Sequence, residues 1–245
     1  MTNTPLVGSS YKRTGPPASP VRSFSRSPKR YTNEGYQDPN FYKIYDYPNP
    51  EEINPTLMKI IEEADKVPSM GGGGRTDWHI FMDKRDEVKE IDLLLSWIEE
   101  KCALFSRKYS KGDWGYTRKD LTDEEYIEHV RQGKIKYQHG GGEGGFDPLR
   151  FEIGECWAMW YDVEAGVVPH SHYPWPIAFV YYVNTPEGCA PTCIGLQDYK
   201  EIRPEPGQVV FIDGHTKHGV PTNVGATPGR AVIAGLFTYI PEKLK

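Results

Sequence analysis

Apolar residues recur at helical spacing in residues 86–106 of the chain. Side chains at positions i, i+3, i+4 and i+7 lie on one face of an α-helix, so this spacing predicts a long helix with one buried face. The apolar stripe consists of Ile91, Leu94, Leu95 and Ile98, continued by Cys102 and Phe105.

Two shorter helices are predicted from their capping residues. In residues 54–67, Asn54 can cap a helix and Pro55 suits its first helical position. Thr122 and Glu125 form the pattern of a capping box, and Gly133 can end the helix that follows.

From Phe151 onward the pattern changes to short apolar runs, rich in β-branched and aromatic residues, that turns separate. These runs are residues 151–163, 177–184, 192–199, 207–213, 218–223 and 230–240. Their number and spacing predict a β-sandwich or small barrel. We therefore expect one α+β domain over residues 41–245, with helical support in residues 41–135 and a β core at about 150–240. The helices should pack on one outer face of the sheet.

A glycine run lies at residues 71–74 within "SMGGGGRTDW". A phosphate cradle requires a strand before the glycines and a helix after them, and in a P-loop also a lysine. Neither the strand nor the lysine is evident, so we interpret the run as a flexible loop.

The N-terminal segment differs in charge from the rest of the chain. Residues 1–33 contain six basic residues and no acidic one, whereas the whole chain has a net charge of −5. This Ser- and Pro-rich composition predicts a disordered tail over residues 1–40. Such a tail is either simply solvated or binds an anionic partner. The overall charge gives no general case for nucleic-acid binding.

No apolar run is long enough to cross a bilayer, and no apolar region typical of a secretory signal is present. The cysteines, Cys102, Cys156, Cys189 and Cys193, lack the spacing of a disulfide scaffold. We expect reduced thiols and a cytoplasmic protein without membrane association.

Four of the seven histidines fall within one 49-residue span: His170, His172, His215 and His218. If residues 170 and 172 lie in one strand, their side chains point to the same face. A metal centre that activates O2 has three protein ligands on one face, often an H-x-[D/E/H] pair and a distant histidine. His170, His172 and His218 fit that scheme, although the first two could also be polar residues at a barrel rim. Imidazole ligands suit Fe, Zn and Cu, so they do not identify the metal.

Arg230 begins an apolar run twelve residues after His218. A buried guanidinium requires an anion, and a carboxylate can accept two parallel hydrogen bonds from it. The partner is then either a carboxylate-bearing cosubstrate or a structural acid.

These motifs resemble the 2-oxoglutarate- and Fe(II)-dependent oxygenase superfamily, on its prolyl-4-hydroxylase-like side, and a group of such oxygenases found in tailed bacteriophages and marine bacteria. The resemblance covers about residues 150–240, through "WAMWYDVEAGVVPHSH", "IAFVYYVNTPEG", "EPGQVVFIDGHTKHGVPTN" and "GRAVIAGLF". It implies a double-stranded β-helix, also called a jelly-roll or cupin-like fold. A phage-encoded protein would be located in the host cytoplasm or in the virion.

The resemblance also implies site residues. His170, His172 and His218 would bind Fe(II), and Arg230 would hold the distal carboxylate of 2-oxoglutarate. Tyr161 would touch that cosubstrate.

Other assignments in the site stay open. Tyr182 could touch 2-oxoglutarate as Tyr161 does, although the sequence does not decide between it and Tyr181, its neighbour of opposite parity. His215, Trp175 and Asp213 are candidates for the substrate pocket or for contact with the ligands. The alternatives are a loop histidine, a packing residue and a turn residue, respectively.

This sequence departs from the family at His172, where most members have Asp or Glu. The resemblance predicts a dioxygenase that hydroxylates an unidentified substrate and releases succinate and CO2. The first alternative is a cupin-type three-histidine dioxygenase. Against it, no glutamate follows the H-x-H closely. The second alternative is a non-catalytic structural or binding module, for example in a phage particle, on a degenerate oxygenase fold.

Overall fold

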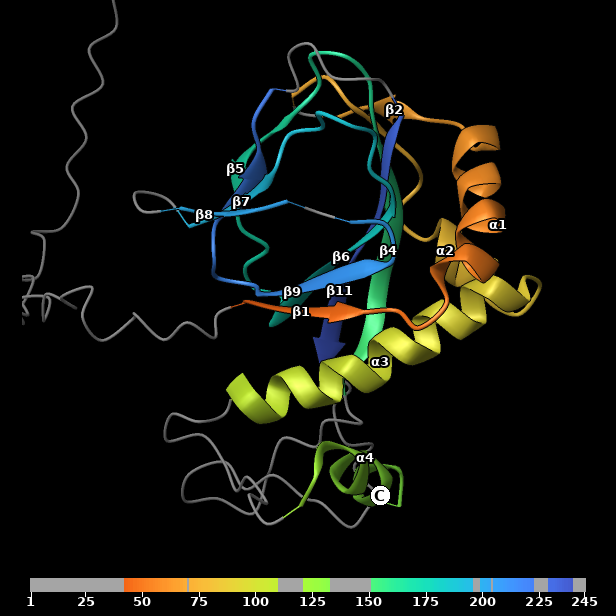
Figure 1. The fold of residues 1–245 in the computed structure, drawn as a ribbon, viewed down its shortest axis with the longest axis vertical. Coiled ribbons are helices and arrows are strands. Elements are labelled where there is room, and N and C mark those ends of the chain that lie inside the picture. The colour runs from red at the N-terminus through yellow and green to blue at the C-terminus, as the bar shows by residue number, and fades with distance from the viewer. Residues whose placement is uncertain are drawn as a thin grey trace, which may run out of the picture. The chain divides into compact units, whose positions relative to one another are not determined.

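Two antiparallel β-sheets face each other, and helices cover the outer face of the larger one (Figure 1). A computed structural model describes residues 42–69, 71–109, 121–132, 151–195, 199–203, 205–222 and 229–239. All of these residues belong to one compact unit, Pro39–Lys245. The arrangement confirms the predicted α+β class with a double-stranded β-helix and helices on one face.

The large sheet has the strand order β1-β9-β6-β11-β4-β3-β2. Its strands are β1 (Tyr42–Asp46), β9 (Gln208–Asp213), β6 (Ile177–Asn184), β11 (Arg230–Tyr239), β4 (Phe151–Tyr161), β3 (Gly74–Arg75) and β2 (Val67–Pro68). The small sheet has the order β5-β10-β7-β8. Its strands are β5 (Val167–His170), β10 (His218–Val220), β7 (Thr192–Ile194) and β8 (Lys200–Ile202). Each of the six predicted runs contains one of these strands.

Strict alternation along the large sheet separates two cores. In β6, Phe179 and Tyr181 pack toward the helices, whereas Ala178 and Tyr182 pack between the sheets. This follows from the two-residue period of a strand, whose successive side chains point to opposite faces. Both faces of the central strands are therefore apolar, and the inner face forms the wall of the space between the sheets.

Helix α3 (Lys89–Tyr109) packs on the outer face of the large sheet. The predicted stripe is confirmed, since each of its six members is at most 2% exposed. Helix α4 (Asp123–Arg131) begins with the predicted capping box: the Glu125 N–H donates to Thr122 Oγ1, and the Thr122 N–H donates to a Glu125 carboxylate oxygen. Gly133 lies outside the described residues.

Helix α1 (Pro50–Glu63) begins before the predicted start, with Pro50 in its first turn and Pro55 inside it. The earlier proline supplies the preset φ of an N-terminal position, and acidic residues follow it in the first turn, where the helix dipole favours them. Asn54 is therefore not the cap. Its Nδ2 donates to Val183 O at 3.0 Å, and its Oδ1 accepts from Tyr181 Oη at 2.7 Å, which ties α1 to β6.

The prediction of helical support over residues 41–135 is wrong in two places, because β1 pairs with β9 at one edge of the large sheet and β2 and β3 form its other edge. An edge strand has a neighbouring strand on one side only and is more exposed than a central strand, so its pattern of apolar residues is weaker. A short helix, α2 (Ile80–Asp83), precedes α3.

The glycine run is not simply a loop. Strands β2 and β3 form a hairpin, and β3 pairs with β4 at the end of the large sheet. Gly71 and Gly72 have φ values of +107° and +95°, which residues other than glycine rarely adopt. A Cβ at Gly73 would lie 2.9 Å from Trp160 O. The run therefore permits a tight hairpin that docks closely on β4.

All four cysteines are free thiols. Among the described residues, no helix is long and apolar enough to cross a membrane. The predicted tail, residues 1–40, lies outside the described residues.

Candidate functional site

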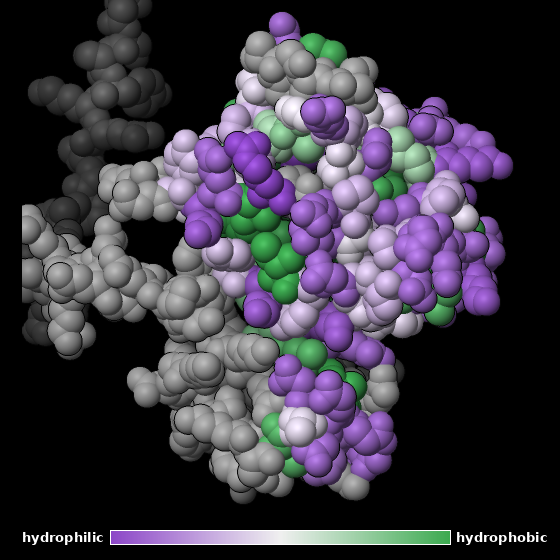
Figure 2. Space-filling view, viewed as in Figure 1, coloured by the Kyte–Doolittle hydropathy of each residue, from purple (hydrophilic) through white to green (hydrophobic). Residues whose placement is uncertain are grey.

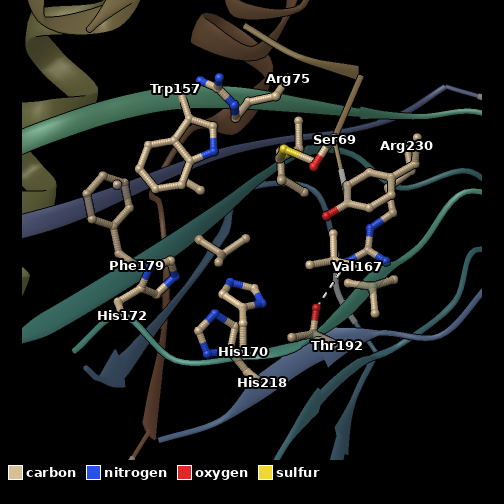
Figure 3. Close-up of a pocket in the computed structure, with 18 of the residues that line it drawn as sticks. Ser69, Arg75, Trp157, Val167, His170, His172, Phe179, Thr192, His218 and Arg230 are labelled. Carbon is tan, nitrogen blue, oxygen red and sulfur yellow. Dashed lines mark hydrogen bonds between the residues drawn. The ribbon is translucent and has the colours of Figure 1, made fainter. Parts of the chain in front are cut away.

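A cavity of about 370 Å³ lies between the two sheets (Figure 3). Its walls include His170, His172 and His218 on one side and Tyr161 and Arg230 of the large sheet on the other. The structure thus brings the predicted ligands and the predicted carboxylate clamp to one cavity, although they are up to 60 residues apart in sequence.

On the face of the molecule seen in Figure 2, hydrophobic residues gather in a narrow strip that hydrophilic residues surround.

Strand pairing brings two of the histidines together. His218 opens β10 and lies opposite His170, the last residue of β5, in antiparallel register. Side chains directly opposite each other in such a pair are near neighbours. The ring centroids of His170 and His218 are 4.6 Å apart. The fold therefore supplies the distant histidine that the sequence spacing required.

His172 reaches the same point from a turn. Strand β5 ends at His170, so the two histidines do not share a strand, contrary to the premise of the sequence argument. The His172 N–H donates to Gly214 O at 2.9 Å, and its carbonyl accepts the Trp175 N–H at 2.8 Å. One potential ligand atom from each of the three histidines lies within 4.8 Å of the others.

Hydrogen bonds select the imidazole tautomer. His170 Nδ1 lies 2.9 Å from Val168 O, and His218 Nδ1 lies 3.2 Å from Thr216 O. A carbonyl oxygen only accepts, so Nδ1 carries the proton in both rings and Nε2 keeps its lone pair. Metal-binding histidines commonly have this arrangement, in which a carbonyl orients the ring. The three-imidazole donor set therefore fits a transition metal such as Fe(II).

Burial keeps two of the rings neutral. It lowers the pKa of His172 to about 3, assisted by repulsion from His218 and His170. Burial and His170 likewise lower the pKa of His218 to about 4, despite the hydrogen bond to Thr216. Neutral imidazoles are the form that binds metal, so neither ring must lose a proton at neutral pH.

Arg230 is 1% exposed and has no acidic partner among the described residues. Its Nη1 donates to Ala190 O at 2.8 Å and its Nη2 to Thr192 Oγ1 at 3.0 Å, while its Nε has no partner. The guanidinium carbon lies 4.8 Å from the Tyr161 ring centroid and 5.7 Å from that of Tyr182. A buried cation is costly without an anion, so this site is built to receive one.

The two candidate tyrosines differ in position. Tyr161 lines the cavity, and burial raises the pKa of its hydroxyl. Tyr182 is behind the lining. Its hydroxyl lies 2.7 Å from Thr192 Oγ1, and burial raises its pKa to about 12. The parity question is settled, because Tyr181 points to the helices and Tyr182 points to the inside.

The last three candidates lie outside the cavity lining. His215 is exposed, and its ring packs 5.1 Å from that of Tyr173. Asp213 is 7% exposed and accepts the backbone N–H of His215 at 2.9 Å, which makes it the turn residue of the alternative interpretation. Trp175 packs against the inner core. None of them lines the cavity, which argues against a place in the substrate pocket, but the backbone N–H of Trp175 does bond the His172 carbonyl.

Several lining residues were not predicted from the sequence, among them Thr192, which positions Arg230, and Arg75 and Trp78, at and just after the end of β3. Thr192 begins a predicted run, but a lone threonine carries no signal of its role. Arg75 and Trp78 follow the glycine run, and only the docking of β3 on β4 shows that they reach the cavity.

Comparison with known proteins supports the fold. No protein-family model matches the chain, and no curated protein matches it. Among solved structures, a Pseudomonas putida prolyl-4-hydroxylase matches 82% of this chain and 94% of its own, with a TM-score of 0.51 and 14% identity.

Two further structures match with lower TM-scores. The viral collagen prolyl hydroxylase from Paramecium Bursaria Chlorella virus-1, solved with 2OG, covers 82% of this chain and 97% of its own at 11% identity and TM-score 0.47. A prolyl hydroxylase from Trichoplax adhaerens, solved with a peptide of hypoxia inducible factor, covers 84% and 86% at 11% identity and TM-score 0.45. The P. putida match shows that the chain has the fold of this prolyl-4-hydroxylase, in keeping with the two facing antiparallel sheets.

Proposed function

We propose that the chain is an Fe(II)- and 2-oxoglutarate-dependent dioxygenase that hydroxylates a substrate and releases succinate and CO2. The observation that carries the proposal is Arg230, a buried guanidinium without an acidic partner among the described residues, in the same cavity as three converging histidines. A metal site alone would not require a buried cation opposite it.

Each residue has a distinct task in this proposal. His170, His172 and His218 would hold Fe(II), each through one ring nitrogen. Arg230 binds the distal carboxylate of 2-oxoglutarate, and Tyr161 contacts the same cosubstrate from β4. Bound Fe(II) would activate O2, which is the oxidant; 2-oxoglutarate would supply two of the four electrons that O2 accepts and the substrate C–H bond the other two. The apolar walls exclude water from the reaction.

His172 stands where an acid is usual, so the ligand set is neutral. Three-histidine sites also suit cupin-type dioxygenases, which act without 2-oxoglutarate. Arg230 distinguishes the two, because a cupin-type reaction has no use for a carboxylate clamp. A non-catalytic module would need neither metal nor clamp.

The test is anaerobic addition of Fe(II) and 2-oxoglutarate to the purified full-length chain. A visible metal-to-ligand charge-transfer band is expected, together with succinate release once O2 is admitted. His170→Ala should abolish the band, and Arg230→Gln should weaken 2-oxoglutarate binding by about a hundredfold, the scale of lost charged hydrogen bonds. The control is His79→Ala, which changes an exposed histidine of the helical half.

Three outcomes contradict the proposal. Metal binding with no response to 2-oxoglutarate would favour the cupin-type alternative. No metal binding, and no rise in melting temperature with metal, would favour the structural module. If the band of Arg230→Gln appeared at the same 2-oxoglutarate concentration as that of the wild type, Arg230 would not bind the cosubstrate, and the proposal would lose its main support.

A further inference from the structure

A second guanidinium, that of Arg75, lies at the cavity on the β2–β3 hairpin. Its carbon lies 3.7 Å from the ring centroid of Trp78, and its Nη1 donates to Thr76 O at 2.8 Å. No acidic side chain among the described residues pairs with it. A guanidinium has five N–H donors, so most of those of Arg75 stay available.

Aromatic rings connect Arg75 to the histidine cluster. The rings of Trp78 and Trp157 meet edge to face at 4.5 Å, and the ring of Trp157 lies 6.3 Å from that of His172. Figure 3 shows Arg75 and Trp157 along one side of the cavity, with the histidines across from them. Trp78 is 40% exposed, so this end of the wall is open to solvent. A molecule bound at this end of the cavity would contact Arg75.

The charge of the lining is one-sided. The described residues that line the cavity include Arg75 and Arg230 but no aspartate or glutamate. A divalent metal and the two carboxylates of 2-oxoglutarate would cancel each other. The charges of the two arginines would then remain, in a site with apolar walls where charge interactions are strong. This excess is local, because the whole chain has a net charge of −5.

We propose that the primary substrate is an anion whose carboxylate or phosphate group binds Arg75, with its apolar part against Trp78 and Trp157. Arginine suits both groups, because its planar fork donates parallel hydrogen bonds to two oxygens. The Trp78 ring holds that fork in place at little entropic cost. The cavity volume, about 370 Å³, leaves room beside the cosubstrate for only the reacting part of the substrate. The inference rests on the proposed function, since the charge balance assumes the metal and 2-oxoglutarate.

Binding of small aryl anions tests this without a known substrate. The full chain is first saturated with Zn(II) and N-oxalylglycine, a 2-oxoglutarate mimic that occupies Arg230. Phenyl phosphate, benzoate and the neutral benzyl alcohol are then titrated by calorimetry. Both anions should bind at least about tenfold more tightly than benzyl alcohol. The anion that binds more tightly indicates whether the substrate carries a phosphate or a carboxylate group. Raising the salt concentration should weaken the binding of the two anions but not that of benzyl alcohol.

Variants assign the effect to Arg75. Arg75→Gln should abolish the preference for anions, and Arg75→Lys should keep part of it, because a lysine retains the charge without the fork. Arg203→Gln, which changes an exposed arginine paired with Glu201 outside the cavity, should bind as the wild type does. If Arg75→Gln does not fold, Arg75→Lys and the salt dependence of the wild type still decide.

Equal binding of benzyl alcohol and the anions would overturn the proposal, as would an unchanged preference in Arg75→Gln. Anion binding that N-oxalylglycine abolishes would also overturn it, because the anions would then occupy Arg230. Failure of the proposed function looks different: N-oxalylglycine itself would not bind, which its own titration shows before any aryl anion is added.

Discussion

The guanidinium of Arg230 lies 4.8 Å from the centre of the Tyr161 ring, and the two residues face each other in register across β11 and β4. The ring holds one side of the guanidinium, and the cavity lies next to both. An anion bound to Arg230 would therefore also meet Tyr161. Tyr182 differs from Tyr161 in this respect, because its hydroxyl forms a hydrogen bond with Thr192.

Removing either tyrosine hydroxyl should have different consequences. Tyr161→Phe keeps the ring under Arg230 and should weaken 2-oxoglutarate binding about tenfold with little change in stability, the loss expected for one hydrogen bond to a charged group. Tyr182→Phe should instead lower the free energy of unfolding by about 1 kcal/mol, because Thr192 loses a buried partner. Calorimetry and urea unfolding of both variants measure this. Equal 2-oxoglutarate binding in Tyr161→Phe and wild type would contradict it.

Thr192 connects Arg230 to Tyr182, and its hydroxyl is the only side-chain group among the described residues that bonds the guanidinium. Thr192→Val keeps the shape but removes this link. We expect a loss of about 1–3 kcal/mol in the free energy of unfolding and weaker 2-oxoglutarate binding, since a buried donor is left unpaired. Thr222→Val, at an exposed position, is the control. A stability change of equal size in both variants would show that the hydroxyl has no special role.

His172→Asp introduces the acid that the resemblance to Fe(II) oxygenases implies at this position. A carboxylate adds negative charge to the ligand set and stabilises Fe(III) more than Fe(II), so the reduction potential of bound iron should fall. His172→Gln, which stays neutral, should leave the potential closer to that of the wild type. Redox titration of the three iron-loaded proteins tests this. Equal potentials in the Asp and Gln variants would mean that residue 172 does not bind the metal.

The metal-free protein should lose stability in acid partly through these histidines. In the folded state the pKa of His172 is about 3 and that of His218 about 4, against a usual value of 6.5. The unfolded chain then binds more protons between these values. The contribution to stability is therefore complete above pH 6.5 and is lost as the pH falls toward 4 and 3.

Comparison with a variant isolates this contribution from that of the carboxyl groups. Urea unfolding of wild type and His172→Gln at about pH 7 and about pH 5 should show a smaller loss in the variant. An identical pH dependence of the two proteins would rule out His172 as a source of the acid sensitivity.

Asn54 should matter for stability although it is not a helix cap. It bonds Val183 O and Tyr181 Oη, and these partly buried hydrogen bonds join α1 to β6. Asn54→Ala should lower the free energy of unfolding by about 1–3 kcal/mol, because both partners lose a hydrogen bond. Thermal or urea unfolding measures this, with Glu51→Ala on the exposed side of α1 as control. A loss no larger than in the control would mean that water replaces both bonds.

Local patterns determined much of the fold. The stripe of α3 and the capping box of α4 depend on contacts between residues three or four apart, and both are confirmed. The alternation along β6 and β11 likewise follows from local geometry. Elements without a strong local pattern were missed: β1 and β8 are short, partly exposed and stabilised mainly by their neighbours in the sheets.

The sequence by itself determined the α+β class and the main strands, and it supplied the residue types for a candidate metal site and a proposed carboxylate clamp. Tertiary structure decided which of them meet. The pairing of β5 with β10 places His218 beside His170, and a turn held by Gly214 brings His172 to them although it lies outside the strand. The same packing leaves His215 in solvent and brings Arg75 to the cavity. Contacts between residues far apart in sequence depend on strand register and sheet packing, and no local spacing encodes these.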